Sequence, residues 1–462
     1  MHNESNTARP QVLSPAMLVR RPAAGWAAIQ PAVRAGAVRQ LVATGSQRWR
    51  RRIELGAAAA AFLAALATTL YVALVESEGV TLRPVQLVPL ALLPFALTAP
   101  RTFAVSRQQP LRFLALLWAA YMTSRFLLLA PTDPLTAVRS LTCVATFLSI
   151  IEFSVRQKRP RAALIGLVAG CLASVAVAAA DISLLGKTPR YYGSSRWTGL
   201  MPDPNRFADL CGIAFVICFA MVIQRTATST RYAWALCLAV CGGGLLASGS
   251  RGGLLATAFA SLATIWLNGK AENRRLRMSN YLKPIAWLCV VTGAAVVVFG
   301  DHVSDRVWEF VTFSSAGRAD VEDDPRGELA VAALEKFRKS PMIGGGAEDL
   351  LLDDREQSSH NSYLYLLSTS GLISFVLCSA LLIVIMRPLW RIARHRSLPA
   401  EIKVLTTPAL GGLIFLLVHM CVIDLVLSAH VWAFLGFAAA VSARCSAMSI
   451  FAAPQQRMKL CV

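Results

Sequence analysis

Charged residues are scarce in this 462-residue chain. Asp, Glu, Lys and Arg together make up 16% of it, whereas 55% of the residues are hydrophobic and the mean hydropathy is +0.53. Soluble domains carry about 25% charged residues. The composition therefore excludes an ordinary soluble domain and predicts a polytopic membrane protein.

Acidic residues are the scarcer of the two charge types, with 26 Asp and Glu against 46 Lys and Arg and a net charge of +20. The basic residues are scattered over predicted loops and are not gathered with aromatic residues on one surface, so no nucleic acid is expected as a partner. The positive charge instead indicates membrane topology and attraction to anionic lipid headgroups.

Cysteines with disulfide or metal-site spacing are also lacking. The eleven cysteines fall in predicted spans or near the C-terminus, as Cys143, Cys211, Cys241 and Cys421 do, and none is predicted in an outer loop. No pair has metal-site spacing with histidine. We therefore expect neither a disulfide framework nor a metal site, and the thiols are expected to pack as small apolar side chains.

Apolar runs of about 17–25 residues, the length that crosses a hydrocarbon core, predict about twelve membrane helices. The predicted spans are 53–75, 84–100, 111–130, 135–153, 162–182, 207–224, 232–249, 252–268, 284–300, 361–386, 404–424 and 428–448. Three prolines interrupt the second span, and the seventh and eighth form either two spans or one re-entrant hairpin. The predicted fold class is an all-α transmembrane bundle with one large extracytoplasmic loop.

Lysine and arginine concentrate in loops that share one side of the membrane when the N-terminus is placed in the cytoplasm. Both termini are then cytoplasmic, and 183–206, the turn at Arg251 and 301–360 face outward. The predicted parts are a basic disordered tail (1–52), nine helices (53–300), a periplasmic loop (301–360), three helices (361–448) and a cytoplasmic tail (449–462). An organelle-targeting peptide is a weaker interpretation of the first part, and no cleavable signal peptide is expected.

The first outward-facing constellation runs from Arg196 to Asn205, just ahead of a predicted span. Gly199 and two prolines force a tight turn, which holds Arg196 and Asn205 at the membrane surface. Two interpretations fit this pattern. Either the two side chains bind a substrate, or Arg196 extends to lipid headgroups while Asn205 caps the following helix.

A second turn, Ser248–Gly253, surrounds the long side chain of Arg251 with small residues. A phosphate or another backbone can approach such a turn closely. No Walker lysine follows and no strand precedes it, which excludes a nucleotide-binding P-loop. Anion binding by Arg251 and a plain inter-helix turn with an interfacial arginine both stay open.

The large outer loop combines acidic residues with a predicted amphipathic helix. Arg318 and Arg326 flank an acidic run that lacks calcium-loop spacing, so a solvated acidic face is favoured over a metal site. A helix is predicted from Arg326 to Lys339, and a flexible glycine turn, Pro341–Gly346, ends it. The predicted apolar face of this helix consists of Leu329, Ala333 and Phe337.

His360 and Asn361 close this loop at the first turn of the next span. An imidazole at that boundary can accept a proton from a sugar hydroxyl. The competing interpretation is an N-cap formed by Asn361 or Ser359, with His360 merely at the interface. Helix packing is expected for His419 and His430, which lack paired ligand spacing.

Few charges fall within the predicted spans, and most lie close to span ends. They include Arg125, Arg139, Glu152, Asp181 and Asp424. We expect them to reach the interface or to pair with neighbouring loops. A transporter would carry more mid-membrane acids and glycine-broken helices in matching halves, so this scarcity argues against transport.

Taken in order, these segments resemble the O-antigen ligase/polymerase superfamily of polytopic membrane glycosyltransferases, often called the Wzy/WaaL group. The resemblance runs from about Tyr191 to Leu377. Its motifs are R-x-x-G…D-P-N (Arg196, Gly199, Asp203, Pro204, Asn205), S-R-G-G (Ser250–Gly253), an arginine-opened helix leading to P-x-x-G-x-G (Arg326, Pro341, Gly344, Gly346), and H-N-x-x-L…G (His360, Asn361, Leu364, Gly371). Ser368–Ser370 stand where family members commonly have an acidic residue.

The resemblance implies transfer of a glycan from undecaprenyl pyrophosphate to a hydroxyl acceptor at the outer face of the bacterial inner membrane, with no cofactor. The acceptor would be a lipid core or a growing surface polysaccharide. His360 would be the general base, with Arg196 and Arg326 stabilising the departing pyrophosphate. The implied substrate-binding residues are Arg251, Asn205, Asn361, Arg318, Gly344 and Gly346.

The implied partners are the lipid-linked glycan donor, its acceptor, membrane lipids and a chain-length regulator protein. The sequence leaves the choice between a ligase and a polymerase open. A protein O-oligosaccharyltransferase of the same superfamily is an alternative, and a non-enzymatic lipid-glycan flippase or transporter is the alternative outside it.

Overall fold

The computed structural model describes residues 51–71, 75–77, 80–98, 109–129, 134–157, 160–182, 196–224, 228–272, 326–346, 350–352, 355–357, 360–394 and 400–459. The chain divides into two units, Met1–Ile53 and Glu54–Val462. In the first unit, only 51–53 are described, and they are helical. The second unit contains every feature discussed below.

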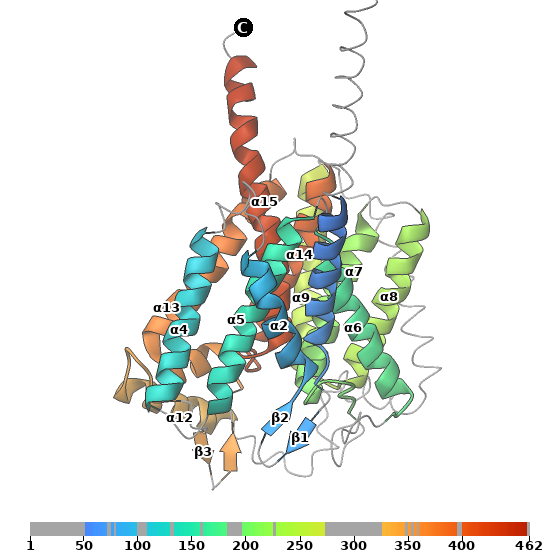
Figure 1. Ribbon diagram of the computed structural model, residues 1–462. Coiled ribbons are helices and arrows are strands. Elements are labelled where there is room, and N and C mark those ends of the chain that lie inside the picture. The colour runs from blue at the N-terminus through green and yellow to red at the C-terminus, as the bar shows by residue number, and fades with distance from the viewer. Residues whose placement is uncertain are drawn as a thin grey trace, which may run out of the picture. The chain divides into compact units, whose positions relative to one another are not determined.

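Helices account for most of the described part of the second unit (Figure 1). They comprise residues 54–67, α2 (Pro84–Thr98), α4 (Gln109–Leu129), α5 (Pro134–Val155), α6 (Ala162–Ala179), α7 (Pro204–Ile223), α8 (Thr228–Ala247), α9 (Arg251–Glu272), α12 (Arg326–Lys339), α13 (Ser362–Arg394), α14 (Ala400–His419) and α15 (Ala429–Lys459). Each predicted span overlaps one of these helices, except 284–300, which lies outside the described residues. The spans 53–75 and 404–424 extend beyond their helices, which end at 67 and 419. The predicted surface helix, α12, has the predicted bounds.

Five helices in the described part are long and apolar enough to cross a membrane. They are Ala137–Val155, Ala162–Ala179, Pro204–Ile223, Ser229–Ala247 and Ser362–Arg394. Pro84–Thr98 and Val404–His419 are shorter apolar helices. The count of twelve spans and the side on which each loop lies stay predictions.

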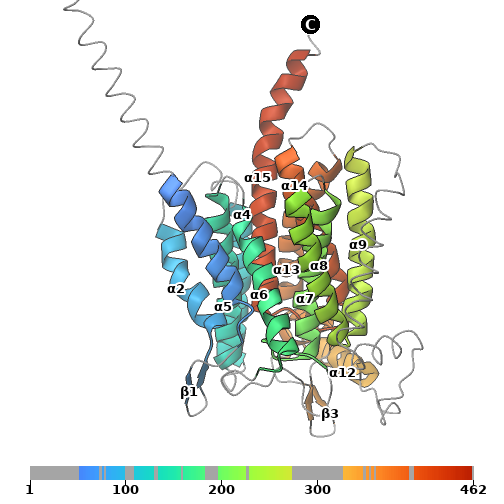
Figure 2. The same ribbon diagram turned by 90° about the vertical axis from the view of Figure 1, so that its right-hand side faces the viewer.

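The predicted all-α class is confirmed for the described residues, which also contain two short antiparallel hairpins. β1 (Val75–Ser77) pairs with β2 (Val80–Leu82), and β3 (Leu350–Leu352) pairs with β4 (Arg355–Gln357). Strands of three residues are too short to show a reliable alternation of apolar and polar side chains, so sequence periodicity could not reveal them. Both hairpins lie, with α12, at the end of the helical unit opposite the C-terminal end of α15 (Figures 1 and 2).

Helix α7 is the most enclosed of the five candidate spans, with 89% of its apolar window buried. It packs against α8, α9 and α14. Gly212 lets it approach α14, since a Cβ there would lie 2.4 Å from the ring of Phe415. Any polar side chain on α7 must therefore find its partners within the protein.

A buried ion-pair group joins α4 to α5. Glu152 is 3% exposed and pairs with Arg112 of α4 and, at 3.7 Å, with Arg156. Arg156 also donates a hydrogen bond to the Ala96 carbonyl of α2 (2.9 Å). The expected pairing with a neighbouring loop describes Arg156, which directly follows α5, whereas Arg112 belongs to helix α4.

Helix α13 is broken at Gly371, where φ is +72° and ψ is −174°. The glycine turn that follows α12 packs against this break. The amides of Gly345 and Gly346 donate to the Ser368 and Thr369 carbonyls at 2.8 and 3.0 Å, and the Leu372 amide donates to the Pro341 carbonyl at 2.9 Å. Non-helical backbone can lie inside a membrane protein only when its polar groups are paired in this way.

The α12 surface helix buries its predicted apolar face. Leu329 is fully buried and Ala333 is 1% exposed, whereas Phe337 is half-buried. Helix α12 packs on α13, and its glycine turn is also bonded to α4, because Arg125 donates a hydrogen bond to the Gly344 carbonyl at 2.6 Å. Two segments more than 200 residues apart in the chain therefore share one contact.

Replacing Gly344 with alanine is expected to destabilise the protein by about 2 kcal/mol or more. Gly344 has φ +72°, and a Cβ would lie 2.4 Å from the Ser370 nitrogen, so both left-handed strain and a backbone clash oppose alanine. Thermal unfolding of the detergent-solubilised protein measures the effect. Gly327→Ala is the control, because nothing lies within 4 Å of a Cβ there. Equal unfolding temperatures for the two variants would contradict the docking of the turn on α13.

Candidate functional site

The start of α7 is fixed by Asp203. Its backbone is extended, and its Oδ1 accepts hydrogen bonds from the amides of Asn205 (2.9 Å) and Arg206 (3.0 Å), so Asp203 is the N-cap and Pro204 takes the first helical position. The interpretation in which Asn205 caps the helix is therefore wrong. The side chain of Asn205 is left to bind another group.

Gly199 anchors the preceding turn to α6. Its φ is +54°, and a Cβ would lie 2.5 Å from the Ser174 carbonyl oxygen. The Leu200 amide donates a hydrogen bond to Ser174 Oγ at 2.8 Å. Only glycine lets the chain pass so close to α6 in this conformation.

Arg196 joins the α7 turn to the end of α8. Its Nη2 donates to Asn205 Oδ1 at 3.1 Å, and its Nε donates to the Ser248 carbonyl at 2.8 Å. Gly249 lies beside this side chain and adopts φ +64°, a left-handed conformation that favours glycine. The guanidinium is therefore oriented by protein groups rather than simply extended toward lipid headgroups.

The Ser248–Gly253 turn meets the connection between α14 and α15. A Cβ on Gly252 would lie 2.5 Å from Val422 Cγ2 and 3.8 Å from the ring of His419. Arg251 begins α9 with an exposed side chain. Gly252 thus allows close approach of the Val422 side chain, whereas the predicted approach of a phosphate or another backbone stays a prediction.

The same connection, residues 420–428, holds the start of α13; we call it the α14–α15 loop. Asn361 Nδ2 donates to the Cys421 carbonyl (3.0 Å), and the Ser362 amide donates to the Met420 carbonyl (2.9 Å). Ser362 Oγ donates to the Ile423 carbonyl (2.7 Å) and accepts from the Leu425 amide (2.9 Å). Four hydrogen bonds therefore fix the backbone that carries His360.

His360 lies in a left-handed backbone conformation with φ +48°. This region is uncommon for residues other than glycine and persists where the surroundings enforce it. Asn361 Oδ1 accepts from the amides of Tyr363 and Leu364 at 3.0 and 3.1 Å. Asn361 therefore caps α13, as the competing interpretation predicted, and also ties it to the α14–α15 loop.

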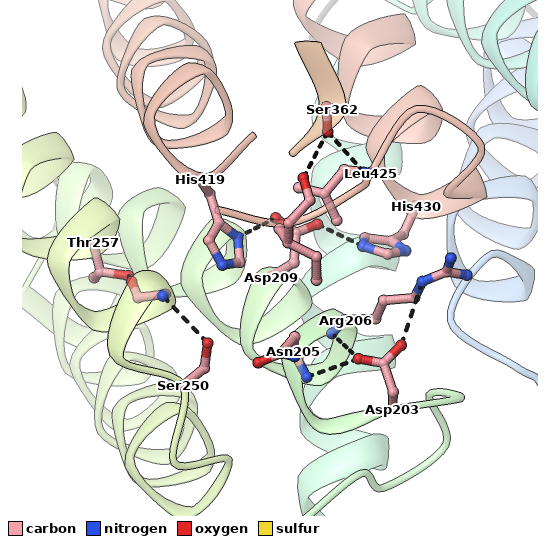
Figure 3. A network of polar contacts seen from close by, with 12 residues as sticks. Asp203, Asn205, Arg206, Asp209, Ser250, Thr257, Ser362, His419, Leu425 and His430 are labelled. Atoms are coloured by element: carbon pink, nitrogen blue, oxygen red, sulfur yellow. Dashed lines mark hydrogen bonds and ion pairs between the residues drawn. The ribbon is translucent and has the colours of Figure 1, made fainter. Parts of the chain in front are cut away.

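Three of the four predicted motif segments thus meet at one place. Arg196, which is bonded to Asn205, contacts the end of α8. The turn that follows α8 contacts the α14–α15 loop, and this loop holds His360 and Asn361. Figure 3 shows Asn205, Ser250 and Ser362 around this junction. The segments are distant in sequence, and their order in the chain alone could not have shown the contact.

The glycine turn after α12 contacts α13 through backbone hydrogen bonds. Arg326 is the first residue of α12, and its side chain, like the whole of Arg318, lies outside the described residues. Gly344 and Gly346 pack on the break in α13, where their φ values are +72° and +96°. Close packing accounts for glycine at 344, and the positive φ accounts for it at 346, where a Cβ would meet nothing within 4 Å. A role of either residue in binding substrate stays a prediction.

The structure also reveals a buried group that the sequence interpretation missed. Asp209 of α7 is fully buried; its Oδ1 lies 3.0 Å from His419 Nδ1, and its Oδ2 lies 2.6 Å from His430 Nε2 (Figure 3). The prediction that both histidines serve only helix packing is therefore incomplete. A sequence signal did exist, since Asp209 is the one acidic residue in the apolar run 207–224.

Arg206 adds a further cation at the start of α7. Its Nε lies 3.4 Å from Asp203 Oδ2, and it interacts electrostatically with Asp424 of the α14–α15 loop. The sequence interpretation placed no role on Arg206. Its position strengthens the attraction between the α7 turn and the loop.

Cys421 corrects the prediction that every cysteine outside the tail lies in a span. Helix α14 ends at His419, so Cys421 falls in the α14–α15 loop with an exposed side chain. Among the described histidine, cysteine, aspartate and glutamate residues, no group of three or more is arranged to hold a metal ion.

Residues 234–379 match a family model described as O-Antigen ligase. This part of the chain is similar to an O-antigen ligase domain. The match supports membership of the O-antigen ligase/polymerase superfamily, as the motifs predicted, and with the apolar helices it identifies an integral membrane protein. No curated protein matches the chain.

The matched region, residues 234–379, contains the Ser248–Gly253 turn, α12 and the His360–Ser362 segment. Arg196, Asn205 and the Asp209–His419–His430 group lie outside it. The candidate site therefore includes residues from outside the matched region.

Asp203→Ala is expected to lower the stability of the protein by about 1 kcal/mol, because the amides of Asn205 and Arg206 lose their capping acceptor. Asp203→Asn is the matched control, since it keeps an oxygen acceptor but removes the charge facing Arg206. Thermal unfolding in detergent compares the two variants. A loss of equal size in both would assign the stabilisation to the ion pair and contradict the cap.

Proposed function

We propose that this protein is a membrane glycosyltransferase that transfers a glycan from undecaprenyl pyrophosphate to a hydroxyl group of a lipid core or growing surface polysaccharide. The similarity to an O-antigen ligase domain supports the enzyme class. The donor, the acceptor and the outer face of the bacterial inner membrane as the place of reaction are parts of the proposal.

One observation carries the proposal: an oriented arginine and the His360 segment share the same junction. Arg196 is held by Asn205 and by the Ser248 carbonyl, and the adjoining turn contacts the loop that fixes His360. Guanidinium groups bind phosphate oxygens bidentately and keep their charge at every relevant pH. A base and a phosphate-binding cation are the two groups that glycan transfer from a pyrophosphate requires.

In the proposed reaction, the acceptor hydroxyl oxygen attacks the anomeric carbon of the donor glycan. The bond between that carbon and the pyrophosphate oxygen breaks, and its electron pair stays on the pyrophosphate. The hydroxyl proton passes to the imidazole of His360. Arg196, Arg326 and Arg251 stabilise the charge that develops on the leaving group.

The fixed backbone around His360 favours this role. A base works best when it is already positioned, because misplacement by about 1 Å can cost about 100-fold in rate. The Asn361 cap and the bonds from Ser362 to the α14–α15 loop provide such positioning. The left-handed backbone at His360 is a strained feature of the kind that concentrates at functional sites.

The proposed topology places α12, both hairpins and the α14–α15 loop outside, and both termini in the cytoplasm. Helix α12 and the hairpins lie at one end of the helical unit (Figures 1 and 2). The excess of lysine and arginine in the other loops supports this orientation. An outer location suits a soluble glycan acceptor and a lipid-borne donor.

His360→Ala and Arg326→Ala are each expected to reduce glycan transfer by about 100-fold to 1000-fold, because one removes the base and the other a cation. The assay is the formation of polymer or ligated glycan in a strain that lacks the chromosomal gene. Membrane levels of each variant are measured in parallel. Arg338→Ala, at an exposed position of α12, is the control and should remain active. Full activity of both site variants would refute these roles.

Cys421 offers a test of the topology, because it is the exposed cysteine among those the structure describes. A membrane-impermeant maleimide is expected to label it in intact spheroplasts if the α14–α15 loop faces outward. The Cys421→Ser variant identifies the labelled peptide by its loss. Labelling that requires permeabilised membranes would place the loop in the cytoplasm and overturn the topology.

A further inference from the structure

We propose that Asp209, His419 and His430 form a buried clamp that positions His360 by fixing both ends of the α14–α15 loop. The activity part of this inference rests on the proposed function. Its structural part concerns only how three helices are joined.

The clamp joins α7, α14 and α15 through one carboxylate. The two oxygens of Asp209 take separate partners, His419 Nδ1 at 3.0 Å and His430 Nε2 at 2.6 Å. All three side chains are at most 1% exposed. A carboxylate buried to this degree requires compensation, and here two imidazole N–H groups supply it.

The position of the two histidines gives the clamp its effect. His419 is the last residue of α14, and His430 is the second residue of α15. The α14–α15 loop lies between them and supplies four hydrogen-bonding groups to Asn361 and Ser362. Binding both ends to α7 therefore limits the movement of the loop that holds His360.

The same carboxylate links this loop to the arginine side of the site. Asp209 lies one helical turn beyond Asn205, whose side chain accepts a hydrogen bond from Arg196. Val422, near the His419 end of this loop, also contacts Gly252 of the Ser248–Gly253 turn. The clamp thus sets the spacing between Arg196 and His360, which reaction at a single pyrophosphate requires.

Asp209 is the hydrogen-bond partner that both imidazole rings share. His419 Nε2 and His430 Nδ1 have no hydrogen-bond partner in the described part of the chain. Loss of the carboxylate would therefore leave every nitrogen of the two buried rings unpaired there, which is costly in an apolar interior. This makes Asp209 a positioning residue that acts through the loop and not through contact with substrate.

The first test uses the fact that the two histidines bind through different nitrogens. An asparagine amide can replace the Nδ1 donor, and a glutamine amide can replace the Nε2 donor. His419→Asn and His430→Gln are the matched variants, whereas His419→Gln and His430→Asn place the same amide at the wrong distance. At each position the matched and the swapped variant replace the same buried ring with a neutral amide.

We expect the matched variants to retain glycan transfer within about 10-fold of wild type and the swapped variants to lose about 100-fold, normalised to protein in the membrane. The matched variants should therefore exceed their swapped partners by about 10-fold. Equal activities of the matched and swapped variants, whether high or low, would overturn the clamp, because burial and volume alone would then explain the histidines.

The second test measures the loop without reference to activity. Hydrogen exchange of the full chain in lipid nanodiscs is expected to be at least about 10-fold faster for peptides covering 420–428 in Asp209→Asn than in wild type. Cys218→Ala, a buried position further along α7, is the control and should exchange as wild type. Unchanged exchange in Asp209→Asn would overturn the structural clamp. Faster exchange with unimpaired transfer would overturn its role in positioning His360.

The two tests also separate this inference from the proposed function. If the wild-type protein fails to transfer glycan, the proposed function is contradicted. The exchange experiment would still decide whether Asp209 fixes the α14–α15 loop.

Discussion

Backbone that departs from helical geometry inside a membrane protein must find hydrogen-bond partners within the protein, because lipid offers none. The regions around His360 and Gly371 depend on this constraint. At Gly371, the glycine turn after α12 pairs with the groups that the break in α13 exposes. At the start of α13, the α14–α15 loop pairs with Asn361 and Ser362. Both ends of the first segment of α13 are therefore held by other parts of the chain.

The site follows from these two attachments. The segment that carries His360 is placed by loops and turns rather than by a continuous span, and those loops are placed by side chains of α7. Asp203 caps α7, Asn205 accepts from Arg196, and Asp209 binds the histidines at both ends of the α14–α15 loop. One well-buried helix thus presents successive polar side chains to the motif segments that meet at this junction. A rigid element of this kind is a suitable base for groups that must act at fixed distances.

Much of the fold could be predicted from the sequence, because apolar runs of membrane length are strong signals. Helices were found at every described predicted span, and α12 has the predicted bounds because an amphipathic pattern between Pro325 and a glycine turn defines it. The helix ends were less predictable. Helix α14 ends at His419, where the following residues remain apolar, so composition gave no signal for the loop that contains Cys421.

The sequence could predict several residues of the candidate site, but it could not predict most of the contacts between them. Motif order identified Arg196, Asn205 and His360, but local preference alone could not decide that Asp203 rather than Asn205 caps α7. The group around Asp209 was missed because its three members lie on three helices, and pairing across helices leaves no spacing in the sequence. A lone acidic residue in an apolar run predicts a polar partner on another helix, because burying a carboxylate without a partner is costly.

The contact between Arg125 and the Gly344 carbonyl bears on whether the matched region can be grafted onto other proteins. Helix α4 supplies this hydrogen bond, and Trp118 and Tyr121 of the same helix bond to Ser374 and Ser370 around the break in α13. All three partners on the other side lie in the matched region 234–379, whereas α4 lies before it. That region is consequently not an exchangeable module: a chimaera that grafts it onto another member's N-terminal helices must bring along the matching face of α4.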